Sequence, residues 1–422
     1  MSMKERMLIT GGHALQGTVH ISGGKNTAVA VIPATLLCDE PCTIENLPDI
    51  SDVHALVDIL RSLGAKVDYE PNRFMTVDPR PAEGWQVSYR DSQRLRASYY
   101  LLGALLGRRG QAEVYQPGGC EIGSRPIDQH LKGFRMLGAN VEQMGGRIKA
   151  KADVLTGTDV VFDCVSVGAT INVMLAAAKA HGTTIIYNAA KEPHIVDLAN
   201  FLNTMGARIS GAGTDTVKIR GVNALRGGTY TIIPDQIEAG TYLAAVTATG
   251  GNVLVQNVIP KHLECITSKL QDLGARVVPF DDSIRIISNR RLRPSTAKTS
   301  PYPGFPTDMQ AQVCVCMALA SGTSRLTESV YETRFFGYCS ELESMGAKIS
   351  IENKTATVIG VDHLNGATVS AHDLRAGAAL VIAGLAAHGV THVQNIHFVE
   401  RGYEDLIGKL TALGADIKRI EE

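Results

Sequence analysis

One short motif recurs six times along the chain and constrains its fold more than any other feature. In each copy a leucine or methionine is followed by Gly-Ala, a polar residue and a valine or isoleucine, with the glycines at positions 64, 138, 206, 274, 346 and 414. The glycines are 68–74 residues apart in a chain of 422 residues, which indicates six copies of one unit of about 70 residues. This unit is longer than the repeats of open solenoids, and three copies predict a domain of about 210 residues.

Each copy shows the same order of local patterns. Apolar residues at helical spacing precede each glycine and predict helices over residues 53–63, 127–137, 195–205, 262–273, 336–345 and 403–413. The glycine predicts a left-handed helix end, and the alternating residues after it predict a strand. Later in each copy, a helix rich in small residues precedes another β-rich segment. The chain is therefore predicted to be an α/β protein of two domains, each with three repeats.

Charge and composition limit the partners that the chain can bind. The chain has 41 Lys and Arg and 42 Asp and Glu, so it lacks the basic excess of a general nucleic-acid binder but can still hold a local cationic pocket. It shows neither a signal peptide nor an apolar run of about 18–20 residues that would cross a membrane. Its eight cysteines include no CxxC pair, which is typical of reduced thiols. We therefore expect a soluble cytoplasmic protein without nucleic-acid or membrane partners, and its oligomeric state stays open.

Residues that differ between the repeats are the candidates for function. Lys25 follows Gly23-Gly24 at a predicted helix start, where a cation is unfavourable unless an anion also binds. Cys120 lies in a loop rich in proline and glycine, with Arg125 five residues later, and a thiol near cations can act as a nucleophile or proton donor. The alternatives are a solvated surface lysine and an incidental cysteine.

Further charged residues also occupy non-equivalent positions of the repeats: Arg96, Arg334, Arg375 and Arg401. Each alone is compatible with a surface ion pair, but together with Lys25 and Arg125 they suit a ligand that carries phosphate and carboxylate. Asp308, after Pro306 at a predicted helix start, is an acidic group available as a base. The sequence contains no P-loop, HExxH, GxSxG or dinucleotide fingerprint, and its Cys314-Val-Cys316 pair and scattered histidines lack the spacing of metal ligands.

Taken together, these motifs resemble those of a known family, the UDP-N-acetylglucosamine 1-carboxyvinyltransferases, which are enolpyruvyl transferases. The motifs are Gly-Lys25-Asn26, Arg96-Ala-Ser, Pro-Gly-Gly-Cys120-x-Ile-Gly-x-Arg125-Pro-x-Asp128-x-His130, Ser166-Val-Gly-Ala-Thr, Phe-Pro-Thr-Asp308-Met-Gln and Arg401-Gly-Tyr-Glu. The resemblance covers the whole chain. It implies a two-domain inside-out α/β barrel of six βαβαββ repeats, three per domain. One domain would comprise residues 1–22 plus 234–422, and the catalytic-loop domain residues 23–233.

The resemblance also implies an activity, the transfer of the enolpyruvyl group of phosphoenolpyruvate to the 3-hydroxyl of UDP-N-acetylglucosamine with release of phosphate. This reaction belongs to peptidoglycan synthesis, and so to cell wall biogenesis, cell shape, the cell cycle and cell division. No metal or organic cofactor is implied. The oligomeric state is not implied either, and the two substrates would be the partners of the chain.

By the same resemblance, the catalytic residues are Cys120, Asp308, Lys25 and Arg401. Cys120 would donate a proton to the methylene carbon, which also implies inactivation by fosfomycin-like epoxides, and Asp308 would take the proton of the sugar hydroxyl. The ligands of phosphoenolpyruvate would be Lys25, Asn26, Arg96, Arg125 and Arg401. The ligands of the UDP-sugar would be Arg96, Arg125, Pro126, Ile127, Asp128, Gln129, Cys164, Val165, Ser166, Val167, Asp308 and Val330.

Three positions depart from the family pattern. Cys164 replaces a usual lysine, Gln236 a usual arginine and His194 a usual glutamate, so a secondary paralogue with weaker turnover is an alternative to the primary enzyme. A sister enzyme, 3-phosphoshikimate 1-carboxyvinyltransferase, would carry a Gly-Asn-Ala-Gly-Thr motif, which is absent here. A non-catalytic regulator that binds sugar nucleotides is the remaining alternative.

Overall fold

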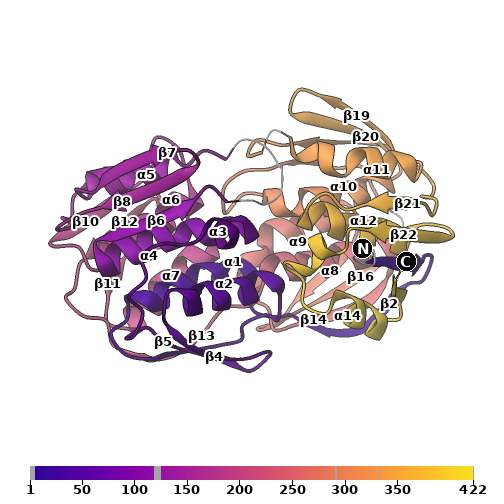
Figure 1. The fold of residues 1–422 in the computed structure, drawn as a ribbon. Helices are drawn as coiled ribbons and strands as arrows, with labels where there is room; N and C mark the ends of the chain where they lie inside the picture. Colours follow the sequence, from indigo (N-terminus) through magenta and orange to yellow (C-terminus); the bar gives the residue numbers. More distant parts are fainter. Residues whose placement is uncertain (1–4, 118–124, 290–291, 332, 422) are drawn as a thin grey trace. The chain divides into compact units, whose positions relative to one another are not determined.

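The computed structural model describes residues 5–117, 125–289, 292–331 and 333–421, whose contacts divide the chain into two units. The terminal unit comprises the described residues of 5–22 and 234–421, so that it contains both ends of the chain (Figure 1). The central unit comprises residues 23–117 and 125–233. The domain boundaries expected from the sequence, as the limits of independently folding parts, stay a prediction.

The central unit contains seven helices in its described residues, together with the strands of three sheets. Its helices are α1 (Lys25–Ala34), α2 (Ser51–Ser62), α3 (Tyr89–Arg94), α4 (Tyr100–Arg109), α5 (Asp128–Met136), α6 (Val167–Ala177) and α7 (Pro193–Thr204). Its strands are β3 (Cys42–Glu45), β4 (Lys66–Glu70), β5 (Phe74–Asp78), β6 (Gln111–Tyr115), β7 (Asn140–Met144), β8 (Arg147–Lys151), β9 (Asp159–Val161), β10 (Thr183–Tyr187), β11 (Arg208–Ser210), β12 (Thr216–Arg220) and β13 (Gly228–Thr231).

The terminal unit repeats this composition. Its helices are α8 (Gln236–Thr249), α9 (Glu264–Asp272), α10 (Gln310–Ala318), α11 (Cys339–Ser344), α12 (Leu374–Ala386), α13 (His397–Glu400) and α14 (Leu406–Ala412). Its strands are β1 (Glu5–Thr10), β2 (Leu15–His20), β14 (Gly251–Gln256), β15 (Arg276–Pro279), β16 (Ser283–Ser288), β17 (Thr296–Lys298), β18 (Thr323–Thr327), β19 (Lys348–Glu352), β20 (Thr355–Ile359), β21 (Thr368–Ser370), β22 (Val390–Gln394) and β23 (Asp416–Glu421).

The described strands form six sheets, one for each predicted repeat. In the sheet β17-β18-β20-β19, the first two strands are parallel, and β20 runs antiparallel to both of its neighbours. Four other sheets have the same order of parallel and antiparallel pairs. In the sixth sheet, β6-β8-β7, a single parallel bridge between Gln86 and Glu113 marks the place of the missing strand. The prediction of six βαβαββ repeats, three per unit, is confirmed.

The repeated glycines end helices as predicted. All six have a positive φ, between +91° and +109°, which strains any residue with a Cβ atom. Four of the helices before them, α5, α9, α11 and α14, are shorter than the predicted ranges, whereas α2 and α7 each begin two residues earlier than predicted. The range 262–273 begins within a 3₁₀ helix, Pro260–Leu263, and α14 begins only after Asp405, whose side chain accepts a hydrogen bond from the backbone N–H of Gly408. Helical spacing alone did not reveal these starts because they depend on local capping.

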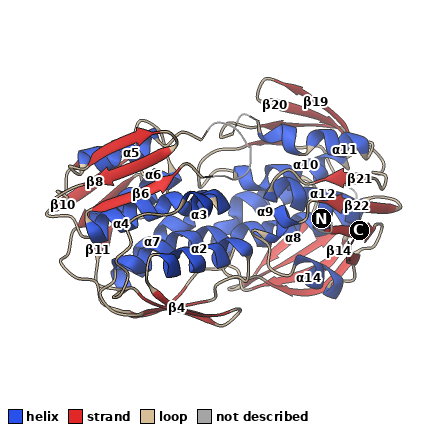
Figure 2. Cartoon of the chain, in the orientation of Figure 1, coloured by secondary structure: helices blue, strands red, loops and turns tan. Residues whose placement is uncertain are grey.

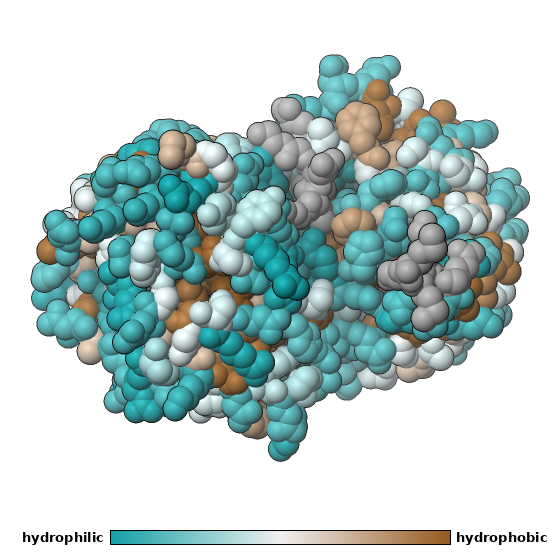
Figure 3. Space-filling model, viewed as in Figure 1, coloured by the Kyte–Doolittle hydropathy of each residue, from teal (hydrophilic) through white to brown (hydrophobic). Residues whose placement is uncertain are grey.

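Helices fill the inside of each unit and sheets cover the outside (Figure 2). The small-residue helices α1, α4 and α6, and their counterparts α8, α10 and α12, are buried on nearly all sides. Hydrophilic residues cover most of the visible face of each unit (Figure 3). The predicted inside-out arrangement is confirmed, although the three sheets of each unit remain separate.

Glycine allows two of these inner helices to approach closely. A Cβ atom at Gly103 of α4 would lie 2.4 Å from the backbone oxygen of Asn172 on α6, and one at Gly107 would lie 2.9 Å from that of Leu175. The backbone N–H of Gly103 donates a hydrogen bond of 2.8 Å to the Oδ1 atom of Asn172. The α4–α6 contact therefore depends on glycine and on one specific polar side chain. None of the helices in the described part of the chain is long and apolar enough to span a membrane.

Candidate active site

The inner helices of the central unit begin at residues that the sequence analysis singled out. Lys25 is the first residue of α1, and Arg96 begins a 3₁₀ helix, Arg96–Tyr99, that leads into α4. Ser166 caps α6 by accepting a hydrogen bond of 3.3 Å from the backbone N–H of Ala169. The first turns of α1 and α6 contain no acidic residue. Helix N-termini are electropositive, and so these starts favour anions.

Lys25 forms an ion pair within the unit. Its Nζ atom lies 2.8 Å from Oδ2 of Asp52 in the first turn of α2, and the two side chains are only 13% and 6% exposed. This contact excludes the alternative of a solvated surface lysine. Asn26, the second residue of α1, is half-buried beside it. Lys25 is therefore held in a defined place at the start of α1.

Arg96 and Arg125 also lie together. The Nη2 atom of Arg96 donates a hydrogen bond of 2.7 Å to the backbone oxygen of Arg125, and its guanidinium lies 5.7 Å from the ring centre of Tyr99. Two predicted ligands that are far apart in sequence are thus neighbours in the central unit.

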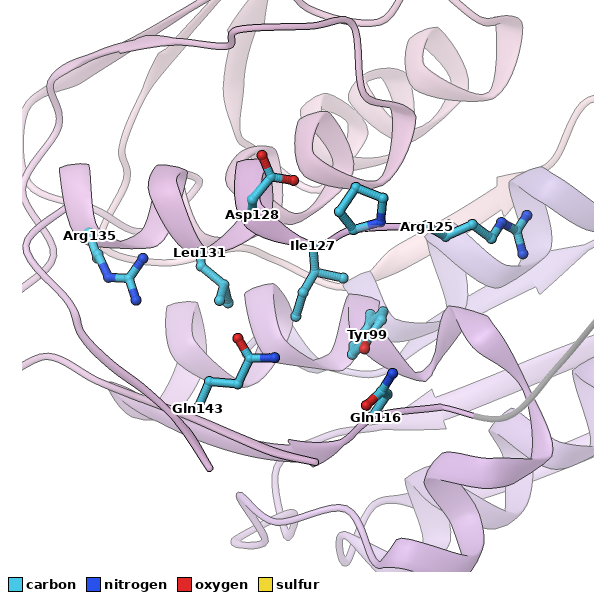
Figure 4. Close-up of a pocket in the computed structure, with 9 residues that line it drawn as sticks. Tyr99, Gln116, Arg125, Ile127, Asp128, Leu131, Arg135 and Gln143 are labelled. Atoms are coloured by element: carbon cyan, nitrogen blue, oxygen red, sulfur yellow. The ribbon is translucent and has the colours of Figure 1, made fainter. Parts of the chain in front are cut away.

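A cavity of about 440 Å³ lies beside Arg125. Three of the predicted ligands line it with Arg125: Pro126, Ile127 and Asp128. The sequence analysis missed the other lining residues, Tyr99, Gln116, Leu131, Arg135 and Gln143. Figure 4 shows Arg125 and Arg135 at opposite ends of the row of side chains that line the cavity, with Ile127 and Leu131 between them.

Gln129 connects the two predicted UDP-sugar segments. Its Nε2 atom donates hydrogen bonds to Oδ2 of Asp128 at 2.8 Å and to Oδ2 of Asp163 at 3.0 Å. Its Oε1 atom accepts one of 2.9 Å from the backbone N–H of Asp163. The start of α5 is thereby tied to the segment 164–167, which includes the exposed residues Cys164 and Val165 and the cap of α6.

In the terminal unit, Asp308 lies between two buried arginines. Its Oδ1 atom is 3.1 Å from Nη2 of Arg334, and its Oδ2 atom is 3.2 Å from Nη2 of Arg375. The arginine side chains are 3% and 5% exposed and that of Asp308 is 27% exposed. Burial lowers the pKa of Arg375, but Tyr403 and Asp308 more than offset this effect, so that the pKa lies above its ordinary value. Asp308 is thus oriented by two cations while part of it stays accessible.

Glu328 is a buried residue near Asp308 that the sequence analysis missed. Its carboxylate accepts hydrogen bonds from the backbone N–H groups of Val330 and Tyr331 at 2.7 and 3.0 Å. It also accepts hydrogen bonds from the hydroxyl groups of Thr299 and Thr307 at 2.7 and 2.9 Å. Glu328 therefore links the turn that presents Val330, a predicted UDP-sugar ligand, to the 3₁₀ helix Thr307–Met309 that contains Asp308.

The repeats contain a signal that would have found Glu328. In four repeats, the strand in the same place is followed at once by an asparagine with a φ of 57–61°, whose side chain donates to a nearby backbone oxygen at 2.7–3.4 Å: Asn46, Asn188, Asn257 and Asn395. The two remaining repeats have Gln116 and Glu328 at this position. Both of these residues lie beside predicted site residues.

Arg401 and Cys120 are the two remaining predicted catalytic residues. Arg401 is half-buried at the C-terminal end of α13 in the terminal unit. Cys120 lies outside the described residues, and its predicted role stays a prediction. Among the described residues, no group of three His, Cys, Asp or Glu side chains could hold a metal ion.

Comparison with known families decides the class of this site. The sequence pattern of the EPSP synthase family, described as 3-phosphoshikimate 1-carboxyvinyltransferase, matches residues 9–410. The chain belongs to this family of enolpyruvyl transferases.

Two relatives are similar to the chain over nearly its whole length and over the whole of theirs. It is 55% identical, over 99% of its length and 100% of the relative's, to UDP-N-acetylglucosamine 1-carboxyvinyltransferase 3 of Caldanaerobacter subterraneus. It is 51% identical, over 98% of its length and all of the relative's, to UDP-N-acetylglucosamine 1-carboxyvinyltransferase of Clostridium botulinum. The resemblance found in the motifs is confirmed.

Solved structures agree with this placement. The enolpyruvyl transferase NikO from Streptomyces tendae superposes with a TM-score of 0.87 at 29% identity, over the whole of both chains. EPSP synthase from Acinetobacter baumannii superposes with a TM-score of 0.75 at 16% identity, over 99% of this chain and all of that one, and supports the fold.

Proposed function

We propose that the chain transfers the enolpyruvyl group of phosphoenolpyruvate to the 3-hydroxyl of UDP-N-acetylglucosamine, with release of phosphate. The observation that carries the proposal is the 55% identity, from end to end, with a relative named for this activity. The EPSP synthase of known structure shares only 16% identity, which disfavours the sister reaction. The small-molecule substrates would then be phosphoenolpyruvate and the sugar nucleotide, in the cytoplasm, as the sequence predicts.

In this proposal, cations bind the anionic donor substrate. As the resemblance implies, Lys25, Asn26, Arg96, Arg125 and Arg401 would bind its phosphate and carboxylate groups. The support is that Lys25 and Arg96 each begin a helix whose first turn lacks an acidic residue, and that Arg96 contacts Arg125. Asp52 would keep Lys25 oriented before the anion binds.

Asp308 would act as the base in the addition step. Each of its oxygens pairs with one arginine, which orients the carboxylate, and the side chain is 27% exposed, so that a sugar hydroxyl could approach it and give up its proton. The hydroxyl oxygen would attack the central carbon of phosphoenolpyruvate while Cys120 donates a proton to the methylene carbon. The resulting ketal would then lose phosphate and a methyl proton to give the enolpyruvyl ether.

Phosphate release from phosphoenolpyruvate tests the proposal. We expect release with UDP-N-acetylglucosamine and none with shikimate 3-phosphate. Release with shikimate 3-phosphate alone would identify the sister enzyme instead. Binding of the sugar nucleotide without any release would support the regulator and contradict our proposal.

A further inference from the structure

Tyr403 occupies a core position of the repeat that is apolar in the other five copies. The residues eleven places before the repeated glycines are Val53, Ile127, Ile195, Leu263, Phe335 and Tyr403, and all six are buried. An apolar side chain therefore suffices for packing at this place. A buried hydroxyl group needs a hydrogen-bond partner to offset the loss of water, so the contacts of Tyr403 indicate what distinguishes the last repeat.

The hydroxyl group of Tyr403 donates a hydrogen bond to Thr241 on α8. The two hydroxyl oxygens lie 2.8 Å apart. The hydroxyl of Thr241 donates to the backbone oxygen of Ile237 at 2.7 Å, so the proton between Thr241 and Tyr403 belongs to the tyrosine. Burial raises the pKa of Tyr403 above its ordinary value, so that this proton is present at neutral pH. The ring is thereby fixed against α8.

The same side chain contacts two residues that lead to Asp308. The guanidinium of Arg375 on α12 lies over the ring of Tyr403, 5.4 Å from its centre. This is within the roughly 6 Å at which an aromatic face attracts a cation. Nε2 of Gln312 on α10 lies 3.5 Å from the phenolic oxygen, and it donates a hydrogen bond of 2.9 Å to the backbone oxygen of Asp308. Tyr403 therefore contacts all three inner helices of the terminal unit.

We propose that Tyr403 is a positioning residue for the base, and that its ring holds Arg375 where this arginine orients Asp308. The inference rests on the proposed function, which makes Asp308 the base. Tyr403 also lies two residues after Arg401, a predicted ligand of phosphoenolpyruvate. One buried side chain thus connects the segment of a predicted substrate ligand to the arginine that orients the base.

Steady-state phosphate release by two variants tests the proposal. Tyr403→Phe keeps the ring and Tyr403→Leu removes it, and both should fold, because Phe335 and Leu263 are buried at the equivalent place of other repeats. For Tyr403→Leu, we expect kcat to fall about 10- to 100-fold, since misplacement of a reacting group by about 1 Å costs that much. KM for both substrates should change little. Tyr403→Phe should recover most of kcat.

Tyr242→Leu is the matched control. Tyr242 is a tyrosine of α8 that is 1% exposed, and its hydroxyl has no hydrogen-bond partner among the described residues. Its replacement removes the same volume from the core of the terminal unit. We therefore expect a loss of stability, and a kcat equal to that of the unchanged protein. An equal fall of kcat in both leucine variants would show a general effect of packing and overturn the proposal.

Two other kinetic results would also overturn the proposal. Full kcat in Tyr403→Leu, with or without a rise in KM, would show that the ring does not position the base. Equal losses of kcat in Tyr403→Phe and Tyr403→Leu would assign the effect to the hydroxyl group instead of the ring.

¹H–¹⁵N NMR of the arginine side chains tests the contact without turnover. In the unchanged protein, Arg375 should give separate signals for its two Nη groups, because a guanidinium that is held in place rotates slowly. Averaged signals would contradict the proposal even if Tyr403→Leu does not fold. In a folded Tyr403→Leu variant, the Nε–H signal of Arg375 should shift, since the ring current is lost. A protein that shows this shift but releases no phosphate would refute the proposed function and leave the contact between Tyr403 and Arg375 established.

Discussion

Oδ2 of Asp308 and Nη2 of Arg375 lie 3.2 Å apart, and this ion pair joins the start of α10 to the first turn of α12. The arginine is almost fully buried, whereas the carboxylate is partly accessible. This arrangement suits a catalytic base. The buried Arg375 is held in place and orients Asp308, which would contact the substrate.

Replacement of Asp308 by asparagine should remove the base and leave two buried arginines without their anion. We expect kcat for phosphate release to fall by about 10²- to 10⁴-fold. Asp215→Asn, at an exposed carboxylate of the central unit, is the control and should leave kcat unchanged. An Asp308→Asn variant with full turnover would show that another group takes the proton.

Glu328→Gln should destabilise the terminal unit. The carboxylate accepts four hydrogen bonds, three of them at Oε1, and a neutral amide would weaken these charge-assisted bonds and reverse the one to the hydroxyl of Thr307, at a cost of about 1–3 kcal/mol. Urea denaturation measures the loss. Because the turn at Val330 depends on the same group, KM for the sugar nucleotide should rise as well, and equal stability of the two proteins would contradict this account.

Glu238 on α8 should make stability fall with increasing pH. Burial raises its pKa from 4.5 to about 7, and this outweighs the opposing effects of Lys409, 2.6 Å away, and of the backbone N–H of Ser22. Between these two pH values the folded chain holds a proton that the unfolded chain has released, so stability declines as pH rises through about 7. The loss is at most about 3 kcal/mol.

Glu238→Gln should abolish that decline, since glutamine does not titrate. The free energy of unfolding of both proteins, measured at pH 5 and pH 8, checks the prediction. A decline of equal size in the variant would assign the effect to other groups.

Gly103→Ala should weaken the contact between α4 and α6. The added methyl group would meet the backbone of Asn172 at 2.4 Å, and overpacking of this kind costs about 1–3 kcal/mol. Gly228→Ala is the control, because its methyl group would meet only Met205, at ordinary contact distances. In thermal unfolding, we expect Gly103→Ala to lower Tm and Gly228→Ala to leave it unchanged.

Cys120→Asp should protect the enzyme from fosfomycin-like epoxides, as the family resemblance implies. Mass spectrometry should find one epoxide adduct on the unchanged protein and none on this variant. Cys164→Ser, at an exposed cysteine, should still form the adduct. An adduct on Cys120→Asp would place the reactive thiol elsewhere.

The sequence was sufficient to predict the repeated architecture, because each of the six glycines must adopt a positive φ for its helix to end and its strand to begin. It also identified Lys25, Arg96, Arg125 and Asp308 as unusual. It could not predict that Asp52 is the partner of Lys25, since that contact depends on how α1 and α2 pack. Arg135 and Gln143 likewise reach the cavity only through the packing of α5 and β7. Glu328 could have been found by comparing the repeats position by position.

The pairing of β1 with β22 and β23 has a consequence for biosynthesis. Residues 5–20 leave the ribosome first, yet the partners of β1 and β2 lie more than 230 residues later in the chain. At about 5–20 residues per second, both strands wait roughly tens of seconds with unpaired edges. The sheets of the central unit use strands from residues 42–231 alone, and all of these are made before any partner of β1 or β2. The order of translation thus allows one half of the protein to be complete while the other still lacks most of its chain.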